Sequence, residues 1–261
     1  MPFGELVALG VLVGLAIGLT GMGSGSLLTP LLILLGGLSP AGAVATSLAF
    51  SFATKLYGSW SFYRRGMVKW EVARDFILGG LVGSLASTFV IRFLLVQHAQ
   101  ALDALMLRAI GLVLILVSLL MLLRLLPANL RPAVFDRPLP LSDHQRRRLI
   151  LPVAFVLGVI VTITSIGSGT VLIPAMVLLY RLDSGTLVGT SVFVGTVLGA
   201  IAGLSYAGLG NLDWRTVAAL LFGSVPALWL ASRHHARTPR AISEAIIAAT
   251  LMGLGVRISI M

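Results

Sequence analysis

The chain has 261 residues, of which 57% are apolar and 11% are charged, and its mean hydropathy is +1.02. One water-soluble core could not bury that much apolar surface, so the composition excludes an ordinary soluble domain. The net charge of +10 comes from Arg and Lys residues that lie mainly in short connections between apolar runs, a pattern typical of membrane orientation and not of nucleic-acid binding. The chain has no cysteine, which excludes disulfides and thiolate metal sites.

The first half begins with an apolar run over residues 3–21, which predicts a membrane-spanning helix. The run lacks the basic start of a secretory signal peptide, so we expect it to be retained. A Gly-Ser break follows, then a short helix over about 25–37, a long span over 42–63, and two further spans over about 74–95 and 102–126. The Pro- and Arg-rich residues 127–148 are expected to link two halves.

The second half repeats the first at an offset of 144 residues, without a gap. The identities are concentrated in Gly, Ser, Thr, Pro and Trp, so apolar composition alone does not explain them. Helices are expected over 148–164, 169–181, 186–207, 215–232 and 241–260. The sequence therefore predicts an all-α, polytopic helical membrane protein with about eight to ten membrane segments, a first repeat over 1–126, a linker over 127–148 and a second repeat over 149–261.

Charges predict that the two repeats have opposite orientations. The loop around residues 64–74 is strongly basic, whereas its counterpart at 208–218 is not, and the next pair of loops shows the reverse. Under the positive-inside rule, equivalent loops then face opposite sides of the membrane. We expect inverted repeats with broken helices at the membrane midplane, a cytoplasmic basic linker and both termini in the periplasm.

Each half contains a glycine-rich break before its short helix. Glycine lets the chain turn inside the membrane, and Ser or Thr can cap the helix that follows. A helix that begins inside the bilayer offers unpaired N–H groups and the positive end of its dipole, which together bind anions. The alternative is that these glycines only permit close helix packing. The candidate substrate-binding residues in the breaks are Gly23, Ser24, Gly25, Ser26, Gly167, Ser168, Gly169 and Thr170.

Polar residues also lie inside the long span of each half. Two Thr-Ser pairs recur at the same place in both halves and can either line a polar path or bond back to the preceding helical turn. Lys55 has no acidic residue nearby in sequence, so burying its charge costs about 2.5–3.5 kcal/mol unless it faces water or an anion. Its alternative is to snorkel toward the cytoplasmic interface. These further candidates are Thr46, Ser47, Lys55, Thr190 and Ser191.

Groups that other chemistries need are not suitably placed. All four histidines, His98, His144, His234 and His235, fall in loops or at helix ends, and most acidic residues do too. An intramembrane catalytic base or a carboxylate cation site is therefore hard to assemble. We expect no enzymatic activity, no cofactor and no metal.

The duplicated motifs resemble those of the sulfite exporter TauE/SafE family. The likeness rests on the two Gly-Ser-Gly breaks with their following prolines (Pro30, Pro174), the Thr-Ser pairs, and the Gly-x-x-x-Trp elements that end at Trp70 and Trp214. It covers roughly residues 5–257. The resemblance implies a multi-pass permease of the bacterial inner membrane for sulfur-containing anions, such as sulfite or sulfoacetate.

The function that we expect is export of a small anion by alternating access. An anion channel and a membrane assembly factor that transports nothing are the alternatives. The expected partners are the anionic substrate and the lipid bilayer, and a homodimer is one state to test.

Overall fold

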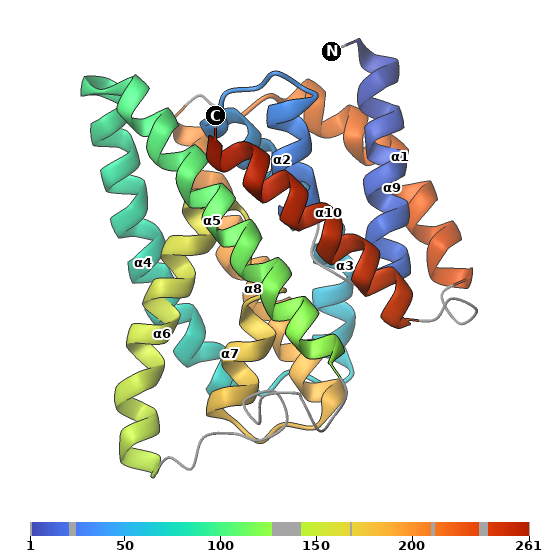
Figure 1. The fold of residues 1–261 in the computed structure, drawn as a ribbon. Helices are drawn as coiled ribbons and strands as arrows, with labels where there is room; N and C mark the ends of the chain where they lie inside the picture. Colours follow the sequence, from blue (N-terminus) through green and yellow to red (C-terminus); the bar gives the residue numbers. More distant parts are fainter. Residues whose placement is uncertain are drawn as a thin grey trace.

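The computed structural model describes residues 2–20, 25–126, 142–167, 169–209, 212–234 and 240–260. These residues form ten helices and no strand, which confirms the all-α prediction (Figure 1). The first half contains α1 (Phe3–Thr20), α2 (Gly25–Leu34), α3 (Pro40–Arg64), α4 (Trp70–Gln97) and α5 (Ala99–Leu125). The second contains α6 (Asp143–Thr164), α7 (Leu172–Leu179), α8 (Ser184–Gly208), α9 (Trp214–His234) and α10 (Arg240–Ile260).

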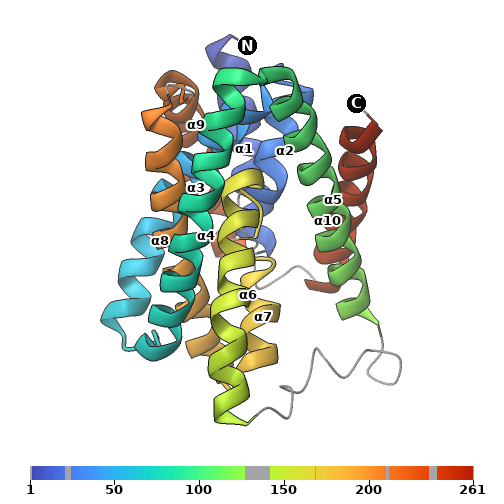
Figure 2. The ribbon, with the colours of Figure 1, turned by 90° about the vertical axis from the view of Figure 1, so that its left-hand side faces the viewer.

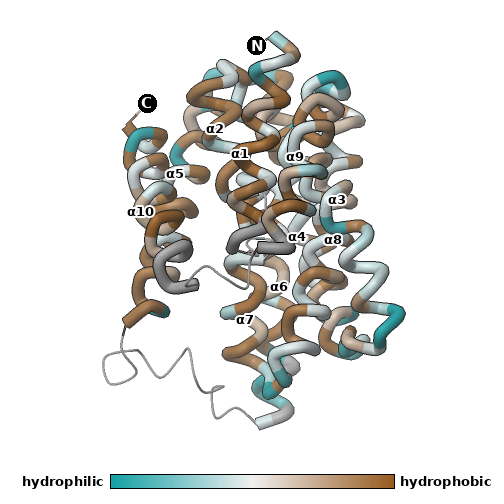
Figure 3. The backbone as a smooth tube through the Cα atoms, turned by 90° about the vertical axis from the view of Figure 1, so that its right-hand side faces the viewer, coloured by the Kyte–Doolittle hydropathy of each residue, from teal (hydrophilic) through white to brown (hydrophobic). Residues whose placement is uncertain are grey.

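Five helices are long and apolar enough to cross a membrane, and they belong to α4, α5, α6, α8 and α9. Parts of α1, α2 and α10 form shorter apolar helices. Helix α3 has 25 residues but is not among these five, and several Ser and Thr residues and Lys55 lie along it. Large apolar side chains such as Phe89, Val96 and Phe222 are exposed on the outside, which a bilayer explains and water does not. Figure 3 shows that hydrophobic residues recur along the helices of the bundle. The chain is a multi-pass membrane protein.

The long third helix of each half starts on a matched cap. The Oγ of Ser39, before α3, accepts the N–H of Gly42 at 3.2 Å, and the Oδ2 of Asp183, before α8, accepts the N–H of Thr186 at 2.9 Å. The two capping residues are 144 positions apart in the sequence, and so are the two residues whose N–H groups they accept. The helix start therefore recurs in the register of the repeat.

Helix α6 begins earlier than we expected. Ser142 and Gln145 form a capping box, in which each side chain accepts the other residue's backbone N–H. The helix therefore starts at Asp143, inside the range 127–148 that we assigned to the linker. Residues 127–141 lie outside the described residues.

Helices from opposite halves pack in pairs, and replacing each helix of a pair by its counterpart in the other half gives another pair that is also present. Helix α1 packs along α9, and its counterpart α6 packs along α4, while α3 packs on its own counterpart α8 and α5 on α10. Figure 1 shows α1 running down from the N-terminus and α6 running up from the bottom, and Figure 2 shows the same opposition. This arrangement supports the inverted repeat, whose relation to the two sides of the membrane stays a prediction.

Glycines make the two paired contacts close, and they do so at equivalent positions. A Cβ at Gly14 in α1 would collide with the Ser224 carbonyl of α9, and a Cβ at Gly158 in α6 would collide with the Gly80 carbonyl of α4. Gly158 is 144 positions after Gly14, and Ser224 is 144 positions after Gly80, so the two contacts are equivalent under the repeat. The absence of a side chain therefore lets both backbone pairs touch.

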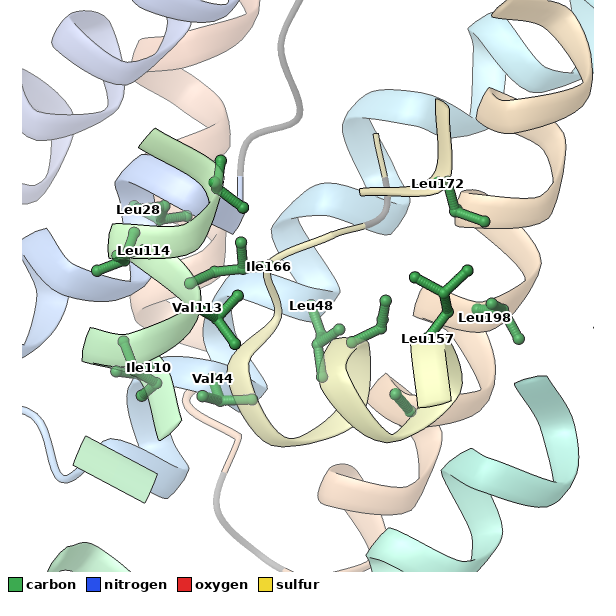
Figure 4. Packing of buried hydrophobic residues seen from close by; sticks show 14 of the residues in the cluster. Leu28, Val44, Leu48, Ile110, Val113, Leu114, Leu157, Ile166, Leu172 and Leu198 are labelled. Carbon is green, nitrogen blue, oxygen red and sulfur yellow. The ribbon is translucent and has the colours of Figure 1, made fainter. Parts of the chain in front are cut away.

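The apolar core surrounds the second break. Ile166, which is fully buried, belongs to the same apolar cluster as Val113 of α5, Leu48 of α3 and Leu157 of α6 (Figure 4). Since α5 and α3 come from the first half, both halves fix the position of this break.

Candidate functional site

The second break bends the chain through two left-handed residues. Ser165 closes α6 with φ 58°, and Gly167 follows with φ 113°. Helix α7 begins only at Leu172 and ends at Leu179, so it is shorter at both ends than the predicted range 169–181. The first short helix begins at Gly25 as expected but ends at Leu34 instead of about 37.

The expected hydroxyl cap on the second short helix is not formed. Val171 stands at the N-cap of α7 and makes no side-chain cap bond, while the Oγ1 of Thr170 is buried and has no hydrogen-bond partner among the described residues. We expected Ser or Thr to cap this helix, and for the described residues that expectation is wrong. Ser168 lies outside the described residues, as do Gly23 and Ser24 of the first break.

The two breaks lie against each other. A Cβ at Gly25, the first residue of α2, would collide with the carbonyl oxygen of Ser165 and would lie 2.9 Å from its Oγ. The start of the first short helix therefore touches the end of α6. The structure brings together, from opposite halves, the two segments in which the sequence predicted a shared site.

Within the part of the chain that the structure describes, five buried hydroxyl oxygens in or near the breaks have no hydrogen-bond partner. They belong to α2, to the start of α3 and to the second break: Thr29, Thr46, Ser47, Ser165 and Thr170. We call these residues the hydroxyl cluster. A buried polar group without a partner costs about 1–3 kcal/mol, so several in adjacent segments require a reason.

The Thr-Ser pairs of the two halves are used differently. Thr46 and Ser47 belong to the hydroxyl cluster, whereas the Oγ1 of Thr190 accepts the backbone N–H of Lys69 at 3.0 Å. Ser191 donates its hydroxyl to the Val188 carbonyl at 2.9 Å, as the bonding-back alternative anticipates. Among the described residues, the second pair is therefore engaged by hydrogen bonds and the first pair is not.

Thr29 and Ser165 are members of the cluster that the sequence did not single out. Thr29 follows Ser26 by three residues, so the two share a face of α2, and both are buried. That spacing is a signal that could have identified Thr29. Ser165 could not be found in this way, because its role depends on the left-handed turn and the contact with Gly25.

Lys55 is half-buried on α3, well away from the hydroxyl cluster. It follows Ser47 by eight residues, about 12 Å along the helix axis. Gly169 lies in the turn before α7, and Ser26 is buried in the first turn of α2. The structure therefore brings the start of α2 against Ser165 of the second break, packs α2 on α3, and places Lys55 eight residues beyond Ser47 on α3.

Apart from Tyr206, whose hydroxyl donates to the Thr162 carbonyl, every buried polar side chain among the described residues is a Ser or a Thr. The site region therefore holds neutral hydroxyl groups and no buried carboxylate or ammonium. In the same described part of the chain, no three His, Cys, Asp or Glu residues gather as a metal site would require. What the arrangement can do chemically is donate hydrogen bonds to the oxygens of a ligand.

Two carboxylates outside the spans hold helix starts. The backbone N–H and then the hydroxyl of Thr186 lower the pKa of Asp183, and the Thr216 hydroxyl, which donates to Asp213 at 2.6 Å, lowers the pKa of that residue. Both groups are caps at loop ends and are not part of the hydroxyl cluster.

Two cavities lie outside the hydroxyl cluster. One of about 800 Å³ is lined by charged residues near the starts of α4 and α6 and by Tyr180 after α7. The other, about 360 Å³, is a mostly apolar groove between α3 and α8. Thr29, Thr46 and Ser47 are themselves fully buried, so the cluster is enclosed by packed protein.

Comparison with known proteins agrees with this architecture. The model of the family Sulfite exporter TauE/SafE matches residues 6–258. The probable membrane transporter protein YjnA of Bacillus subtilis (strain 168) is 32% identical over 256 residues, covering 97% of this chain and 98% of the relative. YunE of the same organism, also named a probable membrane transporter protein, is 25% identical, with 89% and 87% covered.

A third relative, a probable membrane transporter protein of Xylella fastidiosa (strain 9a5c), is 27% identical and covers 83% of this chain and 78% of its own length. No solved structure matches the chain significantly. The family match spans almost all ten helices, including both breaks and the hydroxyl cluster. The chain therefore belongs to the TauE/SafE sulfite exporter family and is a membrane transporter.

Proposed function

We propose that this transporter exports a small anion, sulfite or an organosulfonate such as sulfoacetate, across the bacterial inner membrane. The observation that carries the proposal is the hydroxyl cluster, where two breaks from opposite halves meet. The cluster supplies hydrogen-bond donors for the oxygens of an oxyanion. The N-terminal end of α2, which begins at Gly25, adds the positive end of a helix dipole.

Alternating access is the mechanism that this architecture supports best. The repeat interchanges the α1–α9 and α4–α6 pairs, so an equivalent arrangement with the other side open is available to the same chain. We place the linker in the cytoplasm and both termini in the periplasm. Lys55, farther along α3, would then attract the anion on its way to the hydroxyl cluster.

Export needs no buried proton carrier. An anion leaving a cell whose interior is negative gains about 2.3 kcal/mol per charge per 100 mV. The buried polar groups in the described residues are all hydroxyls, which do not titrate in the physiological range. Flux driven by the membrane potential is therefore consistent with the site.

The first test is the thermal stability of the purified protein with sulfite, sulfate, sulfoacetate, taurine, acetate or chloride at constant ionic strength. A ligand at 100 times its Kd stabilises by about 2.7 kcal/mol, which raises Tm measurably. Thr46→Val keeps the shape of the side chain and removes a hydroxyl without a protein partner. We expect it to fold with unchanged or slightly higher stability and to lose the shift caused by the anion.

The matched control is Thr54→Val, on the same helix. The Thr54 hydroxyl donates to the Phe50 carbonyl at 3.0 Å, so its removal should leave the anion-dependent shift intact. A shift that survives Thr46→Val, or no shift with any anion, would contradict the proposed site. In proteoliposomes, flux that saturates with concentration supports a transporter, flux that never saturates indicates a channel, and no flux favours an assembly role.

A further inference from the structure

An apolar groove runs along the outside of the α3–α8 pair. Its walls are mainly aromatic and aliphatic, and its volume is about 360 Å³. Along α3 it extends from Phe52 to Tyr63, eleven residue steps or about 16 Å. That length is about half of the ~30 Å hydrocarbon core, so the groove spans one leaflet.

One end of the groove carries an aromatic cluster. The rings of Tyr63 and Phe193 stack at 5.9 Å, and Trp70 meets Phe193 edge-on at 6.0 Å. Trp60, also in the groove wall, lies under the guanidinium of Arg64 at 5.3 Å. Trp and Tyr collect where the hydrocarbon meets the headgroups, so this end marks a membrane surface.

Cations at this end divide into two kinds. Lys69 and Arg74 are paired with acids of α4, at 3.9 Å from Glu71 and 3.1 Å from Asp75. Arg64 and its neighbour Arg65, which directly follow the groove, form no ion pair within the described residues, and both are exposed. Figure 3 shows the hydrophilic end of α3 below the apolar part of the helix. The groove therefore ends at two positive charges that the fold does not neutralise.

The opposite end of the groove lacks both features. The repeat places Leu204, Ala207, Gly208 and Leu209 where the first half has Trp60, Tyr63, Arg64 and Arg65. The groove lining is thus apolar along its length, and the exposed cations follow it at one end, while Lys55 near the other end is half-buried and is not part of the lining. A molecule that fits it has one anionic head and one apolar tail.

We propose that this groove binds an anionic phospholipid, with the acyl chain between α3 and α8 and the phosphate against Arg64 and Arg65. A second copy of this chain is disfavoured, because a spanning helix would need a groove through both leaflets and no charge at one end. The proposal concerns the lipid-facing surface and does not depend on which anion is transported.

Native mass spectrometry tests the site on detergent-purified protein with phosphatidylglycerol and phosphatidylcholine that carry identical acyl chains. We expect the wild type to retain phosphatidylglycerol preferentially. Arg64→Gln and Arg65→Gln should each lower that preference about fivefold. The double variant Arg92→Gln/Arg257→Gln removes the same charge from α4 and α10 and should keep the preference.

Ala200→Phe fills the groove and should abolish retention of the specific lipid, whatever its headgroup. Its Tm in lipid-free detergent shows whether the variant folds, and Ala200→Leu gives a smaller filling if it does not. Equal retention of both lipids by the wild type, or a preference unchanged in Arg64→Gln/Arg65→Gln, would overturn the proposal. So would a lipid-free dimer that Ala200→Phe converts to a monomer, since the groove would then belong to a second copy.

Discussion

At the residue scale, Gly25 explains why the two breaks can meet. Its Cα faces the carbonyl of Ser165, and no side chain fits between the two backbones. The repeat places Gly169 at the equivalent position of the second half. The glycine is needed here for close approach, which agrees with the interpretation that the glycines of the breaks permit helix packing. The neighbouring hydroxyls agree with the interpretation that the breaks bind an anion. At this contact the two interpretations are complementary.

Gly25→Ala should therefore destabilise the protein. Forcing a methyl group into a packed contact costs about 1–3 kcal/mol, so we expect a lower Tm and a weaker response to any anion that binds the hydroxyl cluster. Gly58→Ala is the control, because a Cβ there meets nothing within 4 Å and alanine favours the helix by about 1 kcal/mol. Equal Tm values for the two variants in the same detergent would contradict the contact.

At the element scale, corresponding helices keep the same start but serve different purposes. Helix α3 begins on Ser39 and carries a Thr-Ser pair whose hydroxyls have no partner in the described part of the chain, while α8 begins on Asp183 and uses Thr190 to hold the loop before α4. A carboxylate cap differs from a hydroxyl cap in that it titrates. The start of α8 is therefore sensitive to acid in a way that the start of α3 is not.

The pH dependence follows from the lowered pKa of Asp183. Hydrogen bonds from Thr186 make the carboxyl group more acidic in the folded state, so its stabilising effect is complete above the ordinary value of 3.8. The effect is lost as pH falls below that value through the folded pKa. We expect the wild-type Tm to decrease more steeply between pH 5 and about 3 than that of Asp183→Asn, which still accepts the capping bond. Parallel curves would contradict this role.

Sequence reasoning was most successful where a pattern recurs. The order of five helices, the position of both breaks and the start of α2 follow from the 144-residue repeat and the glycines. The late start of α7 could not be predicted, because it depends on positive φ values at Ser165 and Gly167. The different hydrogen bonding of Thr46 and Thr190 could not be predicted either, because it depends on one hydrogen bond from the Lys69 N–H to Thr190, across 121 residues of sequence.

At the scale of the whole molecule, the orientation of the two repeats is the main expectation still to be measured. The chain has no cysteine, so single labelling cysteines can be introduced without background. We expect Arg65→Cys, between α3 and α4, to react with a membrane-impermeant reagent from the cytoplasmic side. Leu212→Cys, in the equivalent connection before α9, should react from the periplasmic side. Labelling of both positions from one side would contradict the inverted topology.

The pairing of α1 with α9 also bears on how the protein is made. Helix α1 finds its main partner only after about 200 further residues have been synthesised, and α4 must wait for α6. During that interval the glycine-lined face of α1, including Gly14, has no partner from its own half to cover it as α9 does. The α1–α9 and α4–α6 pairs can therefore form only after the second half of the chain has been synthesised.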